Sequence, residues 1–142
     1  MTASPPPVVP PAPPVVAVGA VAVRDGALLL VQRAAEPQSG RWSVPGGRVE
    51  PREALAHAVE REVWEETGLV LGCGALLGWA ERMGPGYHFV ILDFTMEVPD
   101  DCPDPVARSD AAAAAWVALE EVSTLALVDG LEAFLRAHGV MG

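Results

Sequence analysis

Three glutamates stand close together near the middle of the chain, within the run Arg61-Glu62-Val63-Trp64-Glu65-Glu66. Successive residues of an α-helix are rotated by about 100°, so Glu62, Glu65 and Glu66 would project within an arc of about 100°. Like charges at this spacing destabilise an isolated helix by a few tenths of a kcal/mol for each pair. A hard divalent cation would compensate, because Mg²⁺ typically binds one or two carboxylates together with water and substrate phosphates. A solvated, charge-laced helix face is the competing interpretation of these residues taken alone.

The surrounding residues predict a loop that leads into a helix. Pro45, Gly46 and Gly47 allow a tight turn, and Pro51 suits a position at or just before the first helical turn. Gly68 suits a left-handed stop at the other end. About four turns of good helix formers lie between these signals.

This helix has an apolar side and a charged side. Leu55, Val59 and Val63 form a stripe that can anchor the helix on a core. Glu53 and Arg61 lie roughly two turns apart on nearly the same side. An ion pair between them would brace the helix and orient the neighbouring glutamates, as partners of metal ligands often do.

The complete spacing resembles the Nudix box, G-x5-E-x7-R-E-U-x-E-E-x-G-U, in which U is an aliphatic residue. Every fixed position matches, and the matching residues are Gly47, Glu53, Arg61, Glu62, Val63, Glu65, Glu66, Gly68 and Leu69. At ordinary residue frequencies, so many coincidences in a short chain are expected less than about once in a million. The chain is therefore identified as a member of the Nudix hydrolase family.

The resemblance implies a fold and a reaction. The fold would be α/β (α+β), a Nudix-type α/β/α sandwich with a mixed β-sheet between helices. The reaction would be metal-dependent hydrolysis of the diphosphate bond in a nucleoside diphosphate linked to another group. The implied cofactor is Mg²⁺ or Mn²⁺, and the implied metal ligands are Gly47, Glu62, Glu65 and Glu66. The implied catalytic residues are Glu62, Glu65, Glu53 and Arg61.

Family members differ in the acid that takes a proton from the attacking water. Some use a glutamate of the box, which corresponds to Glu62 or Glu65 here, and others use an acid from a later loop. Asp110 and Glu97 are the candidates outside the box. We place a box glutamate first and keep the other two open.

Strand and turn signals follow one another through the rest of the chain. Asp25-Gly26 is a strong hairpin signal between two apolar runs. We expect strands over residues 15–24, 27–33, 70–80 in one or two short pieces, 87–98 and 111–117, and a last helix over residues 131–138. Residues 99–110 form a loop rich in Asp and Pro, and long loops of this kind are often functional.

Four residues outside the box are candidates for binding substrate. Tyr87 and Phe89 share one face of the strand at 87–98, where they could border a pocket and stack a base. Arg33 and Arg41 could clamp phosphates with two hydrogen bonds each. Ordinary packing for the aromatic pair and ordinary surface positions for the arginines are the alternatives.

The composition limits the kinds of partner and the cellular location that we expect for the protein. A net charge of −10 argues against a nucleic-acid binder that relies on a basic surface. Cys73 and Cys102 are too few for a disulfide framework and lack partners at metal-ligand spacing. No signal peptide and no apolar run long enough to span a membrane is evident, so we expect a cytoplasmic protein without membrane contact.

The domain organisation is expected to be simple. Residues 1–14 are rich in proline and predict a disordered tail, with a proline-rich docking ligand as the alternative. Residues 15–142 suit a single domain, and a homodimer is left open.

The expected substrate is a nucleotide. The later segments, with YHFVILDF after a Gly/Pro turn, look like bacterial ADP-ribose pyrophosphatases, so ADP-ribose or a related nucleotide comes first. A MutT-like hydrolase of (d)NTPs is the nearest alternative. A non-catalytic Nudix sensor of nucleotides is a third, although such proteins usually lose box carboxylates, and all of them are present here.

Overall fold

The computed structural model describes residues 3–5 and 11–142. Residues 3–5 and 11–14 contain no helix or strand. The predicted disordered tail at 1–14 otherwise falls outside the described residues.

The described chain contains strands from both halves of the sequence, with the longest helix between them. The elements are β1 (Val15–Val21), β2 (Val23–Arg24), β3 (Ala27–Arg33), β4 (Trp42–Ser43), β5 (Gly46–Arg48), α1 (Leu55–Thr67), β6 (Gly72–Gly84), β7 (Tyr87–Glu97), β8 (Ala111–Ala118), α2 (Leu119–Val122) and α3 (Leu131–Ala137). None of these helices is long and apolar enough to cross a membrane.

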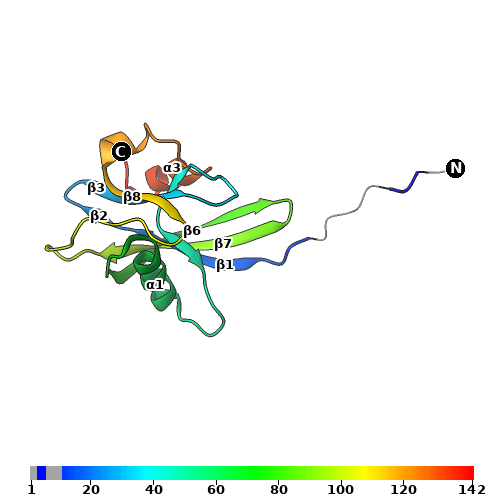
Figure 1. Cartoon of the computed structure of the whole chain (residues 1–142), viewed down its shortest axis with the longest axis horizontal. Coiled ribbons are helices and arrows are strands. Elements are labelled where there is room, and N and C mark those ends of the chain that lie inside the picture. The colour runs from blue at the N-terminus through cyan, green and yellow to red at the C-terminus, as the bar shows by residue number, and fades with distance from the viewer. Residues whose placement is uncertain (1–2, 6–10) are drawn as a thin grey trace.

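The strands form two four-stranded sheets (Figure 1). The first, called sheet A below, has the order β5-β1-β7-β6, and its β1 and β7 run parallel while the other pairs are antiparallel. In the second, sheet B, β3 pairs antiparallel with β8 on one side and with β2 and β4 on the other. The mixed character that we predicted is confirmed, but the strands are divided between two sheets.

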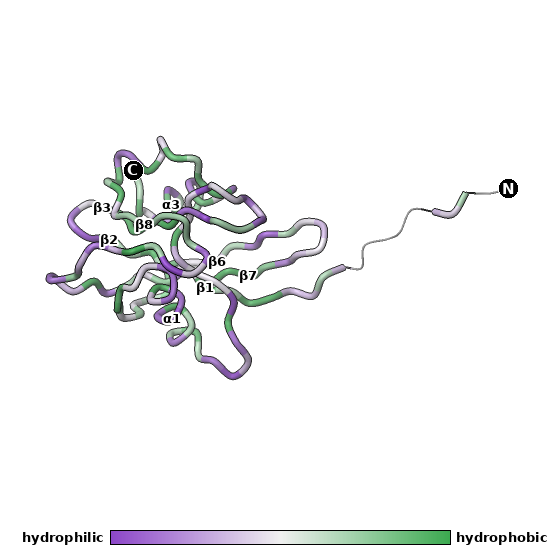
Figure 2. The backbone as a smooth tube through the Cα atoms, viewed as in Figure 1, coloured by the Kyte–Doolittle hydropathy of each residue, from purple (hydrophilic) through white to green (hydrophobic). Residues whose placement is uncertain are grey.

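Two apolar cores lie on opposite sides of the strands. In β3, Leu29 faces the core that holds Val59 and Val63 of α1. Its neighbours Leu28 and Leu30 face the core under α2 and α3. This alternation is the period-two pattern of a strand covered on both faces. Figure 1 shows α1 on one side of the strands and α3 on the other, and Figure 2 shows that the strands are largely hydrophobic while the connecting loops are mostly hydrophilic.

The predicted hairpin is confirmed, but its first strand is interrupted. Asp25 and Gly26 have φ values of 50° and 75° and connect Arg24 to its partner Ala27. Such left-handed pairs form the two-residue turns that match strand twist. The strand expected at 15–24 breaks at Ala22, because the chain passes there from sheet A to sheet B.

The prediction of short strand pieces between residues 70 and 80 is wrong. A single strand, β6, runs from Gly72 to Gly84 and pairs with β7 along its length. Its register shifts between Cys73 and Leu76, and again between Leu76 and Gly78. Irregularities of this kind absorb glycines within a strand without ending it.

The box helix ends where predicted but begins later. Gly68 has a φ of 73° and its N–H donates to the Trp64 carbonyl, so the left-handed stop is confirmed. Pro51 lies in a turn ahead of the helix, which starts at Leu55. Leu55 is 36% exposed, because it opens the first turn at the margin of the core. Its place in the apolar stripe was therefore predicted wrongly.

Candidate active site

A cleft of about 800 Å³ opens on sheet A and reaches the box glutamates. Its floor is the face of the sheet that carries Gly19, Ile91 and Asp93. Residues 35–38, which follow β3, and the start of α3 line its walls. The volume lies within the range of about 300–1,000 Å³ typical of small-molecule sites.

Two glycines let the glutamates of α1 reach this cleft. Gly46 and Gly47 lie on β5, the edge strand of sheet A, with α1 packed beside it. The Gly46 N–H donates to Oε1 of Glu66 at 2.9 Å. A Cβ atom on Gly47 would lie 2.5 Å from the carboxyl carbon of Glu62. The bare backbone of β5 therefore provides the space in which the carboxylates enter the cleft.

Substituting Gly47 with alanine should displace the Glu62 carboxylate. We expect the Gly47→Ala variant to lose at least tenfold in kcat/KM for the nucleotide substrate, since a misplaced catalytic group has costs of this order or larger. Gly72→Ala is the matched control, because a Cβ there meets only the flexible side chain of Glu97 at 3.3 Å. Equal activities of the two variants would contradict this role of the Gly47 backbone.

Arg61 connects the acidic residues of the site. Its Nε and Nη2 donate to the two oxygens of Glu53 at 2.7 and 2.8 Å, so the predicted ion pair is present. Its Nη1 donates to Glu62 at 2.9 Å and to Glu65 at 3.2 Å. The hydrogen bonds from Arg61 hold the pKa of Glu53 well below its usual range. The guanidinium of Arg61 therefore holds the carboxylates of Glu62 and Glu65 from one side.

Arg61→Lys tests this connection. An ammonium cannot reproduce the planar fork that contacts Glu53, Glu62 and Glu65 together. We expect activity to fall by about 10- to 100-fold, the usual cost of removing a partner of metal ligands. The metal concentration that gives half-maximal rate should rise as well. An unchanged metal requirement would show that Arg61 does not orient these carboxylates.

Burial makes the carboxylates nearest the cleft hard to ionise. It raises the pKa of Glu66 to about 8, against the effect of the Gly46 N–H. Burial also raises the pKa of Glu62, although Arg61 opposes this shift. Both carboxylates would be favoured in their charged form by a nearby cation.

The donor atoms of the site are of the kind that binds a hard divalent ion. In 3–5 and 11–142, no three acidic, His or Cys side chains converge closely enough to form a metal cluster. One physical reason is that the Arg61 guanidinium occupies oxygens of Glu62 and Glu65. All the candidate donors are nevertheless oxygens, the ligands that Mg²⁺ and similar ions prefer.

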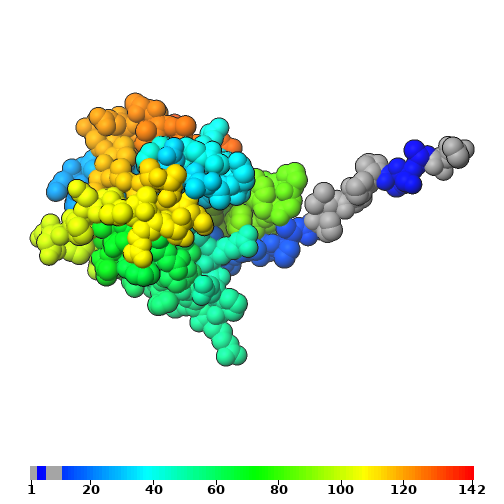
Figure 3. All heavy atoms as spheres, viewed as in Figure 1, coloured from blue at the N-terminus to red at the C-terminus, as the bar shows by residue number. Residues whose placement is uncertain are grey.

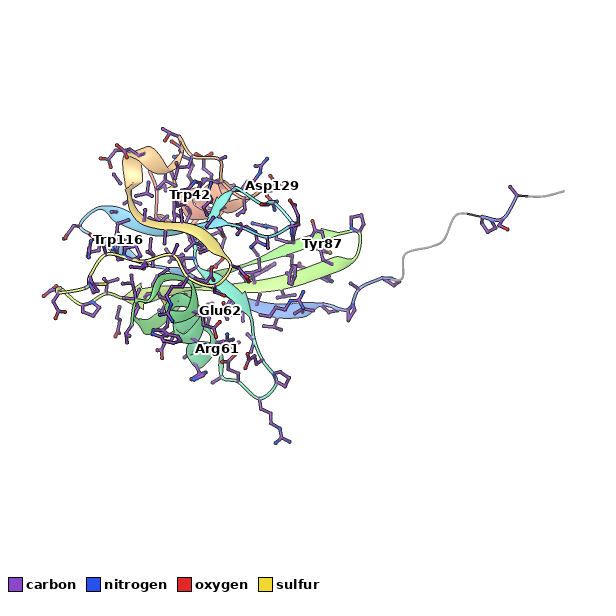
Figure 4. All side chains as sticks on the ribbon, in the orientation of Figure 1. Trp42, Arg61, Glu62, Tyr87, Trp116 and Asp129 are labelled. Carbon is purple, nitrogen blue, oxygen red and sulfur yellow. The ribbon has the colours of Figure 1, made fainter. Side chains whose placement is uncertain are left out.

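The predicted substrate-binding residues separate into two groups. Arg33, Tyr87 and Phe89 line the cleft, and the two aromatic rings lie 6.0 Å apart. Figure 4 shows Tyr87 towards the far end of the β6–β7 hairpin, away from Glu62. Arg41 is absent from the lining of the cleft, because its guanidinium donates to the Leu127 carbonyl at 2.9 Å. The structure thus places Arg41 in the support of the loop before α3.

The two candidate bases outside the box lie in different places. Asp110 lines the cleft, and its charge is among those that raise the pKa of Glu66. Its loop is held against α1 by the Arg108 N–H, which donates to the Glu66 carbonyl at 2.9 Å. Figure 3 shows residues 99–110, in yellow, lying against α1, in green. Glu97 ends β7 opposite Gly72 and does not line the cleft, so only Asp110 remains close to the reaction.

Sequence reasoning did not assign roles to six charged residues that line the cleft. These are Glu36, Arg48, Glu50, Arg82, Asp93 and Asp129. Arg48 places its guanidinium 5.4 Å from the centre of the Phe89 ring. Asp93 shares the alternating face of Tyr87 and Phe89, which was the available signal for it. Arg48 and Glu50 carry no such signal, because they are variable positions of the box.

The comparisons with known proteins agree with this geometry. The NUDIX domain family matches residues 13–137. The chain belongs to the NUDIX family. It is a Nudix hydrolase, and enzymes of this family act on nucleotides and typically depend on divalent metal ions.

Two named relatives are similar to this Nudix hydrolase in sequence. The ADP-ribose pyrophosphatase of Methanocaldococcus jannaschii is 37% identical over 87 residues, which are 60% of this chain and 52% of that protein. The chain thus spans about half the length of that relative. The phosphatase NudJ of Escherichia coli is 31% identical over 112 residues, which are 77% of this chain and 71% of that protein.

Solved structures confirm the fold class. The MutT NUDIX hydrolase from Burkholderia pseudomallei superposes with a TM-score of 0.79 at 30% identity, covering 88% of this chain and 98% of that one. The MutT protein from Methanosarcina mazei superposes with a TM-score of 0.81 at 26% identity, covering 90% and 94%. The predicted family and its α/β fold are both confirmed.

Proposed function

We propose that this Nudix hydrolase cleaves the diphosphate bond of ADP-ribose or a related nucleoside diphosphate joined to a second group. The observation that carries the proposal is the entry of Glu62, Glu65 and Glu66 into a cleft that also presents aromatic and arginine side chains. The similarity to an ADP-ribose pyrophosphatase supports this choice of substrate.

The proposed ligands of an Mg²⁺ or Mn²⁺ ion are the Gly47 carbonyl, Glu62, Glu65 and Glu66. When bound, such an ion neutralises charge on the phosphate oxygens and makes a water nucleophilic. Glu62 or Glu65 takes the proton of the attacking water, with Asp110 as the alternative base. The hydrogen bonds from Arg61 to Glu62 and Glu65 support this role, because they hold both carboxylates in place.

The rest of the cleft binds the substrate. Arg33 lines the cleft, and its charge acts on Glu66. Its Nε donates to the Pro37 carbonyl at 2.9 Å, and the rest of its guanidinium presents a cation to the phosphates. Tyr87 and Phe89 stack the nucleobase, a role that suits aromatic faces at the outer end of the cleft. Arg48 packs over Phe89 and adds a second cation to the cleft.

A MutT-like hydrolysis of (d)NTPs is the second candidate. The structural similarity to two MutT proteins favours it. Both reactions release a nucleoside monophosphate and use the same carboxylates, so the box does not separate them. A sensor without turnover fits less well, because every carboxylate of the box is present.

A substrate panel separates the candidates. Initial rates are measured with ADP-ribose, NADH, diadenosine polyphosphates, dGTP, 8-oxo-dGTP and dCTP, with Mg²⁺ or Mn²⁺ and with EDTA. We expect metal-dependent turnover with the highest kcat/KM for ADP-ribose. A preference for a triphosphate would assign the MutT-like reaction, and no turnover of any compound would leave the sensor.

We further propose that residues 15–142 act as one domain, that the protein works in the cytoplasm and that it forms a homodimer. Light scattering coupled to gel filtration tests the last point directly. A mass equal to one chain would exclude the homodimer at the concentration used.

A further inference from the structure

The tip of the β6–β7 hairpin places a glycine directly opposite Tyr87. Gly84 is the last residue of β6 and the register partner of Tyr87, which begins β7 near the end of the hairpin (Figure 4). Pro85 and Gly86 connect the two strands, and Gly86 has a φ of 81°. Proline followed by a left-handed glycine is the pattern of a type II turn. Because the turn fixes the register, Gly84 is the residue that Tyr87 meets across the hairpin.

The ring of Tyr87 lies over the backbone of Gly84. A Cβ atom on Gly84 would lie 2.5 Å from Cε1 of Tyr87 and 2.6 Å from both Cζ and Oη. Carbon atoms that are not bonded pack at about 3.5–4.0 Å, so the ring can take this place only above a glycine. Tyr87 is only partly buried and lines the cleft. The backbone of Gly84 therefore supports the ring from one side, while part of its surface stays open to the cleft.

This support sets the orientation of Tyr87 relative to Phe89. The planes of the two rings are inclined by 30° and their centroids lie 6.0 Å apart. Residues two apart on one face of a strand are separated by roughly 7 Å, so the rings stand side by side along β7. With so small an inclination, their faces point in nearly the same direction. We call this pair of rings the aromatic platform.

A platform that is already arranged favours the binding of a planar group. Ordering a side chain when a ligand binds costs free energy, and a ring that is held in place beforehand avoids this cost. With a side chain at position 84, the Tyr87 ring would have to rotate away from the hairpin. The platform would then be reduced to Phe89.

We propose that Gly84 is a positioning residue for nucleotide binding, because it holds the Tyr87 ring beside Phe89 in the orientation that stacks the nucleobase. Gly84 has no side chain to contact the base and acts only through Tyr87. This inference rests on the proposed function, in which the two rings receive the base. It adds the residue on which their arrangement depends.

The first test measures KM and kcat for ADP-ribose in the Gly84→Ala variant. The new methyl group should displace the Tyr87 ring and raise KM at least fivefold, since stacking of a base on an aromatic side chain contributes a factor of this size or more. We expect kcat to stay within about threefold, because the box glutamates are not changed. Gly72→Ala, at the other end of β6, is the matched control and should leave both values unchanged. A lower kcat with an unchanged KM would overturn the inference.

A double-mutant cycle separates positioning of the ring from a general effect on the hairpin. Tyr87→Leu should raise KM by a factor similar to that of Gly84→Ala. When Gly84→Ala is added to Tyr87→Leu, KM should not rise further, because the ring that Gly84 supports is already absent. A further increase as large as the one in the wild-type background would show that Gly84 does not act through Tyr87.

The second test does not need turnover. The sequence contains one tyrosine, so protein labelled with ¹³C in its tyrosine ring gives NMR signals from Tyr87 alone. We expect AMP to shift these signals in the wild type in the presence of Mg²⁺. Gly84→Ala should shift them already in the free protein and weaken AMP binding at least fivefold. Ribose 5-phosphate, which has no base, should bind both proteins with the same affinity.

Three results of this titration would refute the role of Gly84. They are identical ring signals in the two free proteins, equal losses of affinity for AMP and for ribose 5-phosphate, and a wild-type Tyr87 signal that AMP does not move. If the wild type hydrolyses no nucleotide, the proposed function fails, while the titration with AMP still decides the inference.

Discussion

Replacing Glu65 with glutamine is expected to lower kcat about a thousandfold without unfolding the protein. Glutamine keeps the size of the side chain but removes the charge that binds a cation and the basicity that accepts a proton, and losses of 10²- to 10⁴-fold are usual for such groups. The fold should survive, because the Glu65 side chain is 39% exposed and its one described salt bridge, to Arg61, spans a single helical turn. Exposed pairs of this kind contribute only a few tenths of a kcal/mol.

Glu120→Gln is the matched control for this variant. Glu120 is exposed on α2, outside the cleft, and the same loss of one negative charge there should leave kcat unchanged. Circular dichroism and the thermal midpoint report whether either variant loses its fold. A Glu65→Gln enzyme that retains more than about a tenth of the wild-type kcat would remove Glu65 from the catalytic residues.

The metal-free protein is expected to lose stability as the pH rises from 6 to 8. The pKa of Glu66 is about 8 in the folded state and near its usual value of 4.5 in the unfolded state. The folded protein therefore binds more protons in this range, so the free energy of unfolding should fall by about 2 kcal/mol and level off above pH 8. Asp93, with a pKa of about 6, contributes mainly below this range. The depressed pKa of Glu53 acts only in acid, where it has the opposite sign.

Urea unfolding in EDTA at several pH values measures this effect, and Glu66→Gln supplies the comparison. Glutamine can still accept the Gly46 N–H but does not titrate, so most of the slope between pH 6 and 8 should disappear. A wild-type protein whose stability is constant across this range would show that Glu66 is not held in a poorly hydrated site.

The box helix could be predicted because its signals are local. Spacing on a helix places Glu62, Glu65 and Glu66 together, and Gly68 ends the helix through its own backbone preference. The pairing of strands is not local. Whether the glycines of β6 end the strand or bend it depends on the neighbouring strand β7, which the sequence does not specify.

The difference between local signals and long-range contacts also decides how much of the site could be predicted. Arg41 and Glu97 have side chains suited to their predicted roles, but the tertiary structure turns Arg41 to the Leu127 carbonyl and leaves Glu97 at the far end of β7. Asp93 looked like one acid on an alternating strand. Its burial against Gly19 follows from the pairing of β1 with β7, which the sequence does not specify.

Product analysis of ADP-ribose hydrolysis tests the central claim most directly. Purified enzyme is incubated with ADP-ribose and Mg²⁺ in water enriched in ¹⁸O. The products are then separated, and their masses are measured by mass spectrometry. We predict AMP and ribose 5-phosphate in equal amounts, one ¹⁸O atom in one of the two phosphates, and no products in EDTA. Intact ADP-ribose under both conditions, or turnover that persists in EDTA, would contradict a metal-dependent cleavage of the diphosphate bond by the box carboxylates.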